Sequence, residues 1–565
     1  KSLRLNLFNK TNITIEKPFY LKNKKISVKH KDVFLKEPKN IIKLFYISHL
    51  SETEIHPQTL RYLPDCAKLL KKKFINNKEI NNYFVDILTS KVDPSKVLRI
   101  MNEANVLGRF VPDFQKVVGL IQYDMYHYYS VDEHTIITIH NIHLLKEGTL
   151  KNISPFATKA MSEIKSFKSL MVAMFLHDIA KGRKGDHSKN GADIAVKLCP
   201  RFGLSAEDTK TVSWLILNHL LLSKIAFKYD LNDMKIIENC SNIISTLERL
   251  RLLLVLTVCD IKSVGPNVWS DWKGALIHEL YIKIKDNLIE KSSSLNYKKE
   301  KINLKEKLFF SLKKKEWNEN SIIAFSSKLS EFYWSSFNLE TIEKHASVYQ
   351  EMSISKKKFF AKFFIKKQGN VSELIVIAPD HHGLFSKISG IVSSCGIDIV
   401  SAKIFTRNDG FAIDTFIVQD KGQKSIVEKR VQKNILLSLE NGLQGNYDYQ
   451  KELINRWQEI PSRFRKMKAP IRVSIDNISS TNFSLIEVNC KNSPGILYVI
   501  TKTLAEQGVQ INSASISTYG NRVMDIFYVK DLFGQKIRDD NKLRKIKIEL
   551  SKILKDTDPA NEMIN

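Results

Sequence analysis

The chain has 565 residues, of which 43% are hydrophobic, so it is long enough to bury several separate cores. Its formal net charge is +28, but the lysines are spread over the whole length, so the composition does not indicate nucleic-acid binding as the primary function. No apolar run could span a membrane and the six cysteines form no Cys-x-x-Cys motif, so we expect a cytoplasmic protein with reduced thiols and no membrane partner.

Helical patterning dominates the first 330 residues. Residues 1–75 begin with short alternating patches and then become helical. From about residue 80, apolar residues recur at helical spacing with few prolines or glycines. The most apolar run, Leu252–Cys259, is bounded by Arg251 and Asp260, so we expect a buried core helix there.

The pattern changes to strands mixed with helices after about residue 370. Leu374–Ile377 and Phe411–Val418 predict buried strands, and between them a turn at Gly383 leads into a helix. The same succession recurs further along the chain, where residues 508–514 (GVQINSA) match residues 396–402 (GIDIVSA). The sequence therefore predicts two related βαββαβ modules.

Histidines are concentrated in the helical region, where seven of the 14 lie between residues 120 and 220. His177 and Asp178 are adjacent at the end of an apolar helix. A buried charge is costly there unless it finds a partner, and a divalent metal would supply one. Further candidate ligands at helix starts or ends are His134, His187, His219 and Asp260. We expect surface or packing roles for His127, His140 and His143.

The ordered set H…HD…H…H…D resembles the HD superfamily of metal-dependent phosphohydrolases, which are all-helical bundles. That resemblance implies one divalent ion on His134, His177, Asp178 and Asp260, with His187 and His219 completing a second ion or contacting phosphate. Imidazole with carboxylate suits Mn²⁺, Fe²⁺ or Zn²⁺, and Mg²⁺ less well. Lys181 follows Asp178 by three residues, and we expect these two nearest the chemistry. Lys181 either contacts phosphate or complements the helix dipole.

Longer runs around these residues resemble one family of HD proteins. VLGRFVPDF (106–114), QYDMYHYYSVDEHT (122–135) and HDIAKGRKGDHS (177–188) are similar to the bacterial bifunctional uridylyltransferase/uridylyl-removing enzymes that modify the PII nitrogen-signalling protein. The two C-terminal modules resemble the paired ACT domains of that family. The resemblance implies that UMP is attached to a tyrosine of PII when glutamine is low. It also implies that the HD domain removes the UMP when glutamine is high, with the ACT pair sensing glutamine.

The sequence departs from this family at its transferase site, which needs a Gly-Ser turn followed by closely spaced carboxylates. No Gly-Ser dipeptide occurs, and the only Asp-x-Asp, at 556–558, lies in the C-terminal tail. Since the chain starts at Lys1, we expect a fragment without that active site, whereas the full-length protein would carry both activities. The expected organisation is a C-terminal remnant of the nucleotidyltransferase region (1–75), an HD domain (76–330), a linker (331–370), a first ACT domain (371–440), an inter-ACT segment (441–479) and a second ACT domain (480–555).

In ACT domains of this family, the turn after the first strand presents backbone amides to an amino-acid ligand, often within Asp-x-Pro-Gly. The second module has Asn492-Ser-Pro-Gly495, and the first has Asp380-His-His-Gly383, with His382 where proline is usual. Both glycines permit close backbone approach, and the acid or amide could meet the ligand amine. Asp380 and Asn492 could equally be helix N-caps, and the sequence leaves this open.

Three functions remain in competition. The leading one is a glutamine-regulated phosphodiesterase that acts on uridylylated PII. A ppGpp hydrolase also combines HD and ACT domains, but the tandem ACT ending and the matching flanks disfavour it. A non-catalytic amino-acid sensor with an inert helical bundle is disfavoured because such a bundle need not retain the whole ligand set.

Overall fold

A computed structural model gives the architecture of the chain. Contacts between residues divide it into two compact units, the first formed by Lys1–Ala226, Lys235–Trp269 and Leu276–Ser292, the second by Phe227–Met234, Ser270–Ala275 and Ser293–Asn565. The structure describes residues 15–121, 128–151, 153–229, 231, 234–265, 268–292, 304–330, 333–334, 337–366, 369–461, 471–477, 480, 482–519 and 522–555.

Among the described residues up to 292, the regular structure is helical apart from a short antiparallel hairpin of β1 (Phe19–Lys22) and β2 (Lys25–Val28). The helices are α1 (Asp32–Lys36), α2 (Lys39–Leu50), α3 (Pro57–Cys66), α4 (Lys72–Ile75), α5 (Lys78–Thr89), α6 (Ser95–Glu103), α7 (Val106–Phe110), α8 (Pro112–Gln115), α9 (Val131–Lys146), α10 (Pro155–Ser162), α11 (Phe167–Leu176), α12 (His187–Arg201), α13 (Ala206–Asn218), α14 (Leu221–Lys228), α15 (Met234–Ile244), α16 (Leu247–Ser263) and α17 (Asp271–Ser292), with a 3₁₀ turn at Ala67–Leu69.

Two helices that are apolar on all sides form the centre of the first unit. Every residue from Leu252 to Cys259 in α16 is buried, as is every residue from Ser169 to Leu176 in α11. Such helices cannot lie at a surface, so other helices surround them. α16 packs against α9, α10, α11 and α13, and α11 also packs against α5, α9 and α12. The expected core helix at Leu252–Cys259 is therefore confirmed, and its C-terminal end carries Asp260 into the bundle.

The second unit is built on one eight-stranded antiparallel sheet in the order β3-β4-β6-β5-β9-β10-β8-β7. β5 and β9 join the two modules, and Ala402 pairs with Ala514 at the centre of that short ladder. The strands are β3 (Phe360–Lys366), β4 (Val371–Pro379), β5 (Asp398–Thr406), β6 (Phe411–Gln419), β7 (Arg472–Asp476), β8 (Ser484–Lys491), β9 (Val509–Tyr519) and β10 (Arg522–Asp531).

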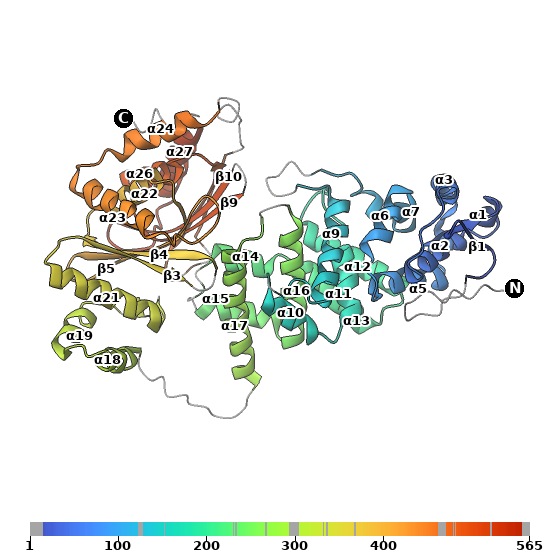
Figure 1. Ribbon diagram of the computed structural model, residues 1–565, viewed down its shortest axis with the longest axis horizontal. Helices are drawn as coiled ribbons and strands as arrows, with labels where there is room; N and C mark the ends of the chain where they lie inside the picture. The colour runs from blue at the N-terminus through green and yellow to red at the C-terminus, as the bar shows by residue number, and fades with distance from the viewer. Residues whose placement is uncertain are drawn as a thin grey trace. The chain divides into compact units, whose positions relative to one another are not determined.

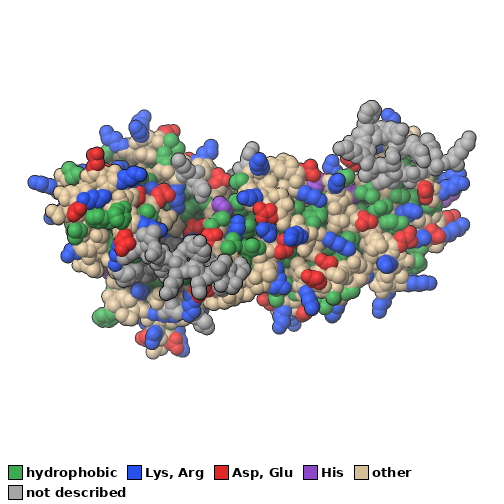
Figure 2. Space-filling view, turned by 90° about the horizontal axis from the view of Figure 1, so that it is seen from below, with side chains coloured by type: hydrophobic (Ala, Val, Ile, Leu, Met, Phe, Trp, Pro, Cys, Tyr) green, Lys and Arg blue, Asp and Glu red, His purple; other side chains and the backbone are tan. Residues whose placement is uncertain are grey.

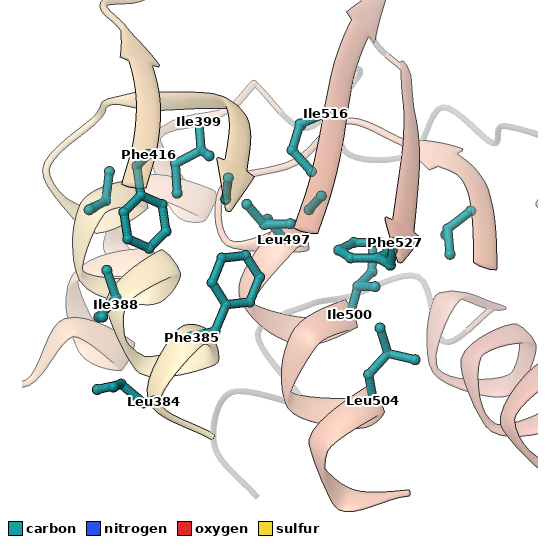
Figure 3. Packing of buried hydrophobic residues seen from close by; sticks show 14 of the residues in the cluster. Leu384, Phe385, Ile388, Ile399, Phe416, Leu497, Ile500, Leu504, Ile516 and Phe527 are labelled. Carbon is teal, nitrogen blue, oxygen red and sulfur yellow. The ribbon is translucent and has the colours of Figure 1, made fainter. Parts of the chain in front are cut away.

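Helices cover both faces of this sheet. In Figure 1, α22 (Leu384–Ser394), α23 (Lys429–Gln444), α24 (Tyr449–Glu459), α26 (Ile496–Glu506) and α27 (Asp540–Lys555) lie on one side of the strands. Figure 3 shows the core on that face, where Phe385 and Phe416 of the first module lie beside Leu497 and Phe527 of the second. α18 (Leu304–Lys314), α19 (Glu319–Ser326) and α21 (Leu339–Ser355) pack on the other face of the first module.

The expected arrangement of a helical bundle followed by two related α/β modules is confirmed. Within each module the βαββα succession is also as expected, but the additional strand stands at the start. β3 precedes β4 and pairs with it, and β7 does the same for β8. β3 lies within residues 331–370, expected to be a linker, and β7 lies within residues 441–479, expected to be an inter-ACT segment. The helices α18 and α19 pack with the sheet rather than with the bundle.

Arg407 connects the β5–β6 hairpin to the helices α19 and α21. Its side chain is fully buried, and its guanidinium pairs with Asp409 at 2.8 Å. It also donates hydrogen bonds to the backbone oxygens of Phe325 and Ala324 and lies over the ring of Tyr349. Its planar fork thus satisfies carbonyls near the end of α19 that would otherwise lack donors.

Replacing Arg407 by alanine is expected to lower the free energy of unfolding by about 3 kcal/mol, because the change removes the partner of a carboxylate and the donors to two backbone carbonyls, of which that of Phe325 is buried. Thermal unfolding of the purified chain checks this. The exposed Arg430 on α23 supplies a control, and Arg430→Ala should change stability by less than about 0.5 kcal/mol. Equal melting temperatures for the two variants would contradict the role given to Arg407.

Surface charge agrees with the dispersed lysines of the sequence. On the face drawn in Figure 2, lysine and arginine side chains are scattered among acidic and apolar ones rather than gathered into one basic patch. Among the described residues, no helix has the length and apolar character needed to cross a membrane.

Candidate metal centre

His134 lies in the first turn of α9 and is completely buried. Its Nδ1 is 3.2 Å from the backbone oxygen of Ser263, and its Nε2 is 3.0 Å from Oδ1 of Asp260. A carbonyl can only accept, so Nδ1 donates to Ser263, and Nε2 is directed at the Asp260 carboxylate.

His177 and His219 share one local geometry. Each is the residue that ends its helix, α11 and α13 respectively, and each is buried. Nδ1 of His177 donates to the backbone oxygen of Met174 at 2.7 Å, and Nδ1 of His219 donates to that of Ile216 at 2.7 Å. The helix end thus fixes both tautomers and leaves Nε2 of each ring as a ligand atom, as metal-binding histidines require.

Asp178 lies at the centre of two ligand groups. Its Oδ2 is 3.2 Å from Nε2 of His177 and 3.7 Å from Nε2 of His134. Its Oδ1 is 3.9 Å from Nε2 of His187 and 3.9 Å from Nε2 of His219. Two sets of three, each with ligand atoms within 4.8 Å of one another, therefore share this one carboxylate: His134, His177 and Asp178, and Asp178, His187 and His219.

Asp260 and His187 form the accessible side of the centre. Asp260 Oδ1 also lies 3.8 Å from Nε2 of His177, so it borders the first group, and its side chain is 14% exposed. His187 begins α12 behind the N-cap Asp186 and is 30% exposed, whereas His134, His177, Asp178 and His219 are at most 2% exposed. A ligand can therefore approach from the side of His187 and Asp260.

The donor set fits divalent metal ions. Within the described part of the chain, three buried atoms at this place make no hydrogen bond: Nε2 of His177, Nε2 of His187 and Oδ1 of Asp178. Leaving several such atoms unpaired in one interior is costly. They are the atoms a metal would coordinate, and imidazole nitrogen with carboxylate oxygen is the ligand mixture that Mn²⁺, Fe²⁺ and Zn²⁺ accept.

The charges of these groups suit a cation. Burial opposes the charged form of Asp178, but His177 and Lys181 hold the pKa of its carboxyl well below the usual range. Burial likewise opposes the imidazolium of His177, yet the Asp178 and Asp260 carboxylates raise its pKa to about 8. Burial lowers the pKa of His219 to about 4, so that ring is neutral at pH 7. Metal binding would therefore displace a proton chiefly from His177.

Lys181 lies beside the shared carboxylate. Its Nζ is 2.6 Å from Oδ2 of Asp178, and its side chain is 9% exposed. Of the other histidines, His140 pairs with Asp93 at 2.7 Å and His143 lies outside both groups. His127 lies outside the described residues.

Comparisons with known proteins agree with this geometry. Three family models match: Uridylyltransferase GlnD third domain at residues 19–110, HD domain at 131–260, and ACR family N-terminal ACT domain at 479–555. The bifunctional uridylyltransferase/uridylyl-removing enzyme of Azospirillum brasilense is 38% identical over 95% of this chain and 58% of that enzyme. The one of Rhodospirillum rubrum is 38% identical over 96% and 58%.

The chain is a homologue of the bifunctional uridylyltransferase/uridylyl-removing enzymes. It spans less than two thirds of the length of these two relatives. The HD match contains all six candidate ligands. Solved structures are only weakly similar: a Thermotoga maritima CCA-adding enzyme complexed with tRNA has a TM-score of 0.29 and 14% identity over 49% of this chain and 57% of that one, which says nothing about function.

The two ACT turns are alike in backbone. Gly383 precedes α22 and Gly495 precedes α26, with φ of 83° and 78°, a left-handed conformation that favours glycine. A Cβ atom on Gly383 would meet nothing within 4 Å, so the space beside it is open. Neither Asp380 nor Asn492 caps the helix that follows. Asp380 instead accepts a hydrogen bond from the Thr406 hydroxyl.

Sequence reasoning missed two kinds of group. The carbonyls that orient the histidines, such as that of Ser263, are backbone atoms and leave no trace in the residue types. Asp414 and Asp525 did leave a trace in the sequence, because each is an acid inside a largely apolar strand and the two occupy the same place in the repeat.

Proposed function

We propose that the metal centre hydrolyses the phosphodiester between UMP and a tyrosine of uridylylated PII, and that glutamine bound to the ACT modules controls it. The observation that carries the proposal is the pair of ligand groups sharing Asp178. The printed name of the relatives supports the substrate, since uridylyl removal is one of their two activities.

The proposed ligands divide between two ions. His134, His177, Asp178 and Asp260 would hold the first, and Asp178, His187 and His219 the second, with Mn²⁺ or Mg²⁺ as the metal and Fe²⁺ as a further candidate. When bound, such ions stabilise the charge that develops on a phosphodiester and activate water for attack.

The chain's own residues prepare that site. Lys181 neutralises part of the charge of Asp178 and holds the carboxylate in place at 2.6 Å. The carbonyls of Met174, Ile216 and Ser263 keep three imidazoles in the tautomer that can bind metal. The partly exposed His187 and Asp260 leave one side open, through which we propose that the tyrosine-linked nucleotide enters.

Measuring UMP release tests this function. The purified chain is incubated with uridylylated PII and Mn²⁺ at several glutamine concentrations, and in parallel with ppGpp. Release of UMP that rises with glutamine is the expected result. Hydrolysis of ppGpp alone would replace the proposal with the ppGpp hydrolase, and no hydrolysis of either would leave the amino-acid sensor.

Metal binding should be visible without turnover. We expect about two Mn²⁺ per chain, and at a hundred times its dissociation constant each ion should add about 2.7 kcal/mol to the free energy of unfolding. Calorimetric titration and thermal unfolding check the two numbers. Asp178→Asn should lose most of both, whereas Asp193→Asn, at an exposed position on α12, should lose neither. A full complement of metal in Asp178→Asn would contradict the shared ligand.

A further inference from the structure

Each ACT module buries one aspartate in the strand behind its candidate ligand turn. Asp414 lies in β6 with 1% of its surface exposed, and Asp525 lies in β10 with none exposed. Asp414 pairs with Val376 and Ile404 on the neighbouring strands. Asp525 pairs with residues of the same types, namely Val488 and Ile516. The two carboxyls therefore occupy the same position of the repeat.

Asp414 lies on the face of the sheet that α22 covers. Side chains alternate along a strand, so Asp414 shares a face with Ala412 and Phe416, which belong to the core beneath the ACT helices. Phe416 stacks on Phe385, the second residue of α22, with ring centroids 5.7 Å apart (Figure 3). Asp414 lies two residues before Phe416 on the same face. It is therefore closer to the edge of the sheet where β4 ends and the turn containing Asp380 begins.

This carboxyl is poorly satisfied by the protein. Within the described part of the chain, neither oxygen of Asp414 makes a hydrogen bond of ordinary geometry. Burial raises its pKa well above the usual range, the nearby Asp380 carboxylate adds to this, and the backbone N–H of Phe405 is the one group that opposes it. A buried carboxyl with so few partners costs stability, and an apolar residue would suit the surrounding core better. Its presence points to a ligand that pairs with it.

The surrounding groups fit a zwitterion. α22 has 11 residues and presents its first backbone N–H groups beside Gly383, where the space is open. A helix N-terminus binds a carboxylate, and a buried aspartate next to it would bind an ammonium group. Asp380, which borders the same place, carries a second negative charge. The second module repeats the glycine, the helix and the buried aspartate, with Asn492 in place of Asp380.

We propose that Asp414 and Asp525 bind the ammonium group of the amino-acid effector and thereby make the ACT modules selective for α-amino acids. This inference rests on the proposed amino-acid control of the enzyme. It assigns the selectivity to carboxyls in the strands rather than to the turn residues alone.

Calorimetric titration of the full chain with L-glutamine and with its deaminated analogue, 4-carbamoylbutanoate, tests the assignment. The wild-type chain should bind glutamine about tenfold or more tightly than the analogue, because only glutamine offers a charged partner to the carboxyl. Asp414→Asn combined with Asp525→Asn should weaken glutamine binding by a similar factor and bind both compounds alike. Asp420→Asn, just beyond the other end of β6, should behave as the wild type, because its carboxylate only closes a surface turn.

The outcomes separate the two proposals. A double variant that still prefers glutamine as strongly as the wild type overturns the role of the two aspartates and leaves amino-acid control intact. A wild-type chain that binds no glutamine overturns both, whether or not it releases UMP.

One measurement needs no variant and covers the case in which the double variant fails to fold. If an ammonium group pairs with Asp414, the wild type must bind L-glutamine more tightly than 4-carbamoylbutanoate, which lacks that group. Equal affinities of the wild type for the two compounds would overturn the assignment.

Discussion

Asp178→Asn is expected to reduce the rate of UMP release from uridylylated PII by about a thousandfold or more. Asp178 is the one residue that belongs to both ligand groups, so its loss removes an anionic ligand from each proposed ion at once. Asparagine has the same shape, so the helices around it should keep their packing. Single-turnover UMP release with saturating Mn²⁺ measures the loss.

The control for this change is Asp193→Asn, which removes a carboxylate from the exposed face of α12 and should retain full activity. Circular dichroism of Asp178→Asn should match the wild type, because the carboxylate makes no contact that builds a helix. A correctly folded Asp178→Asn chain with activity within tenfold of the wild type would falsify the site assignment.

His134→Ala and His187→Ala are expected to have different effects on the rate of UMP release and on the metal content. His134 is completely buried in the first ligand group, and its loss should reduce activity by about a thousandfold. His187 is partly exposed and belongs only to the second group. Its loss should reduce bound Mn²⁺ from about two to about one per chain and the rate by about 10- to 100-fold. Metal content and UMP release are measured on the same preparations.

His143→Ala serves as the matched control for His134→Ala, since both residues lie on α9 but His143 belongs to neither ligand group. If His187→Ala keeps two ions and full activity, the second group is not a metal site. Equal losses for His134→Ala and His187→Ala would instead mean that the two ions bind only as a pair.

The ligand types of the candidate centre could be predicted from the sequence because they lie at helix ends, where a polar residue interrupts an apolar run. His177, His219 and Asp260 all have this signature. What the sequence could not show is that Asp178 lies between two sets of histidines, since that depends on how α9, α11, α13 and α16 pack. It also could not show the orientation of each imidazole, which backbone carbonyls determine.

Two features of the fold were not predicted from the sequence: the strands β3 and β7, and the packing of the helices from α18 to α21 on the sheet. β3 and β7 are edge strands, and edge strands are under weaker demand for a regular apolar alternation because only one side of their backbone is paired. β3, with the sequence FAKFFIK, and β7, with RVSID, therefore do not stand out. The helices from α18 to α21 have an apolar face, but periodicity cannot reveal whether a bundle or a sheet covers that face.

The β5–β9 ladder has a consequence for how such a tandem could have arisen and how it can be divided. Three residue pairs, centred on Ala402 and Ala514, join two halves that otherwise repeat one another. Cutting the chain between the halves would leave each half with an unpaired edge strand, which readily pairs with an edge strand of another polypeptide. A solitary half would tend to rebuild the missing neighbour from a second copy of itself, so the tandem resembles a dimer whose two members were fused into one polypeptide.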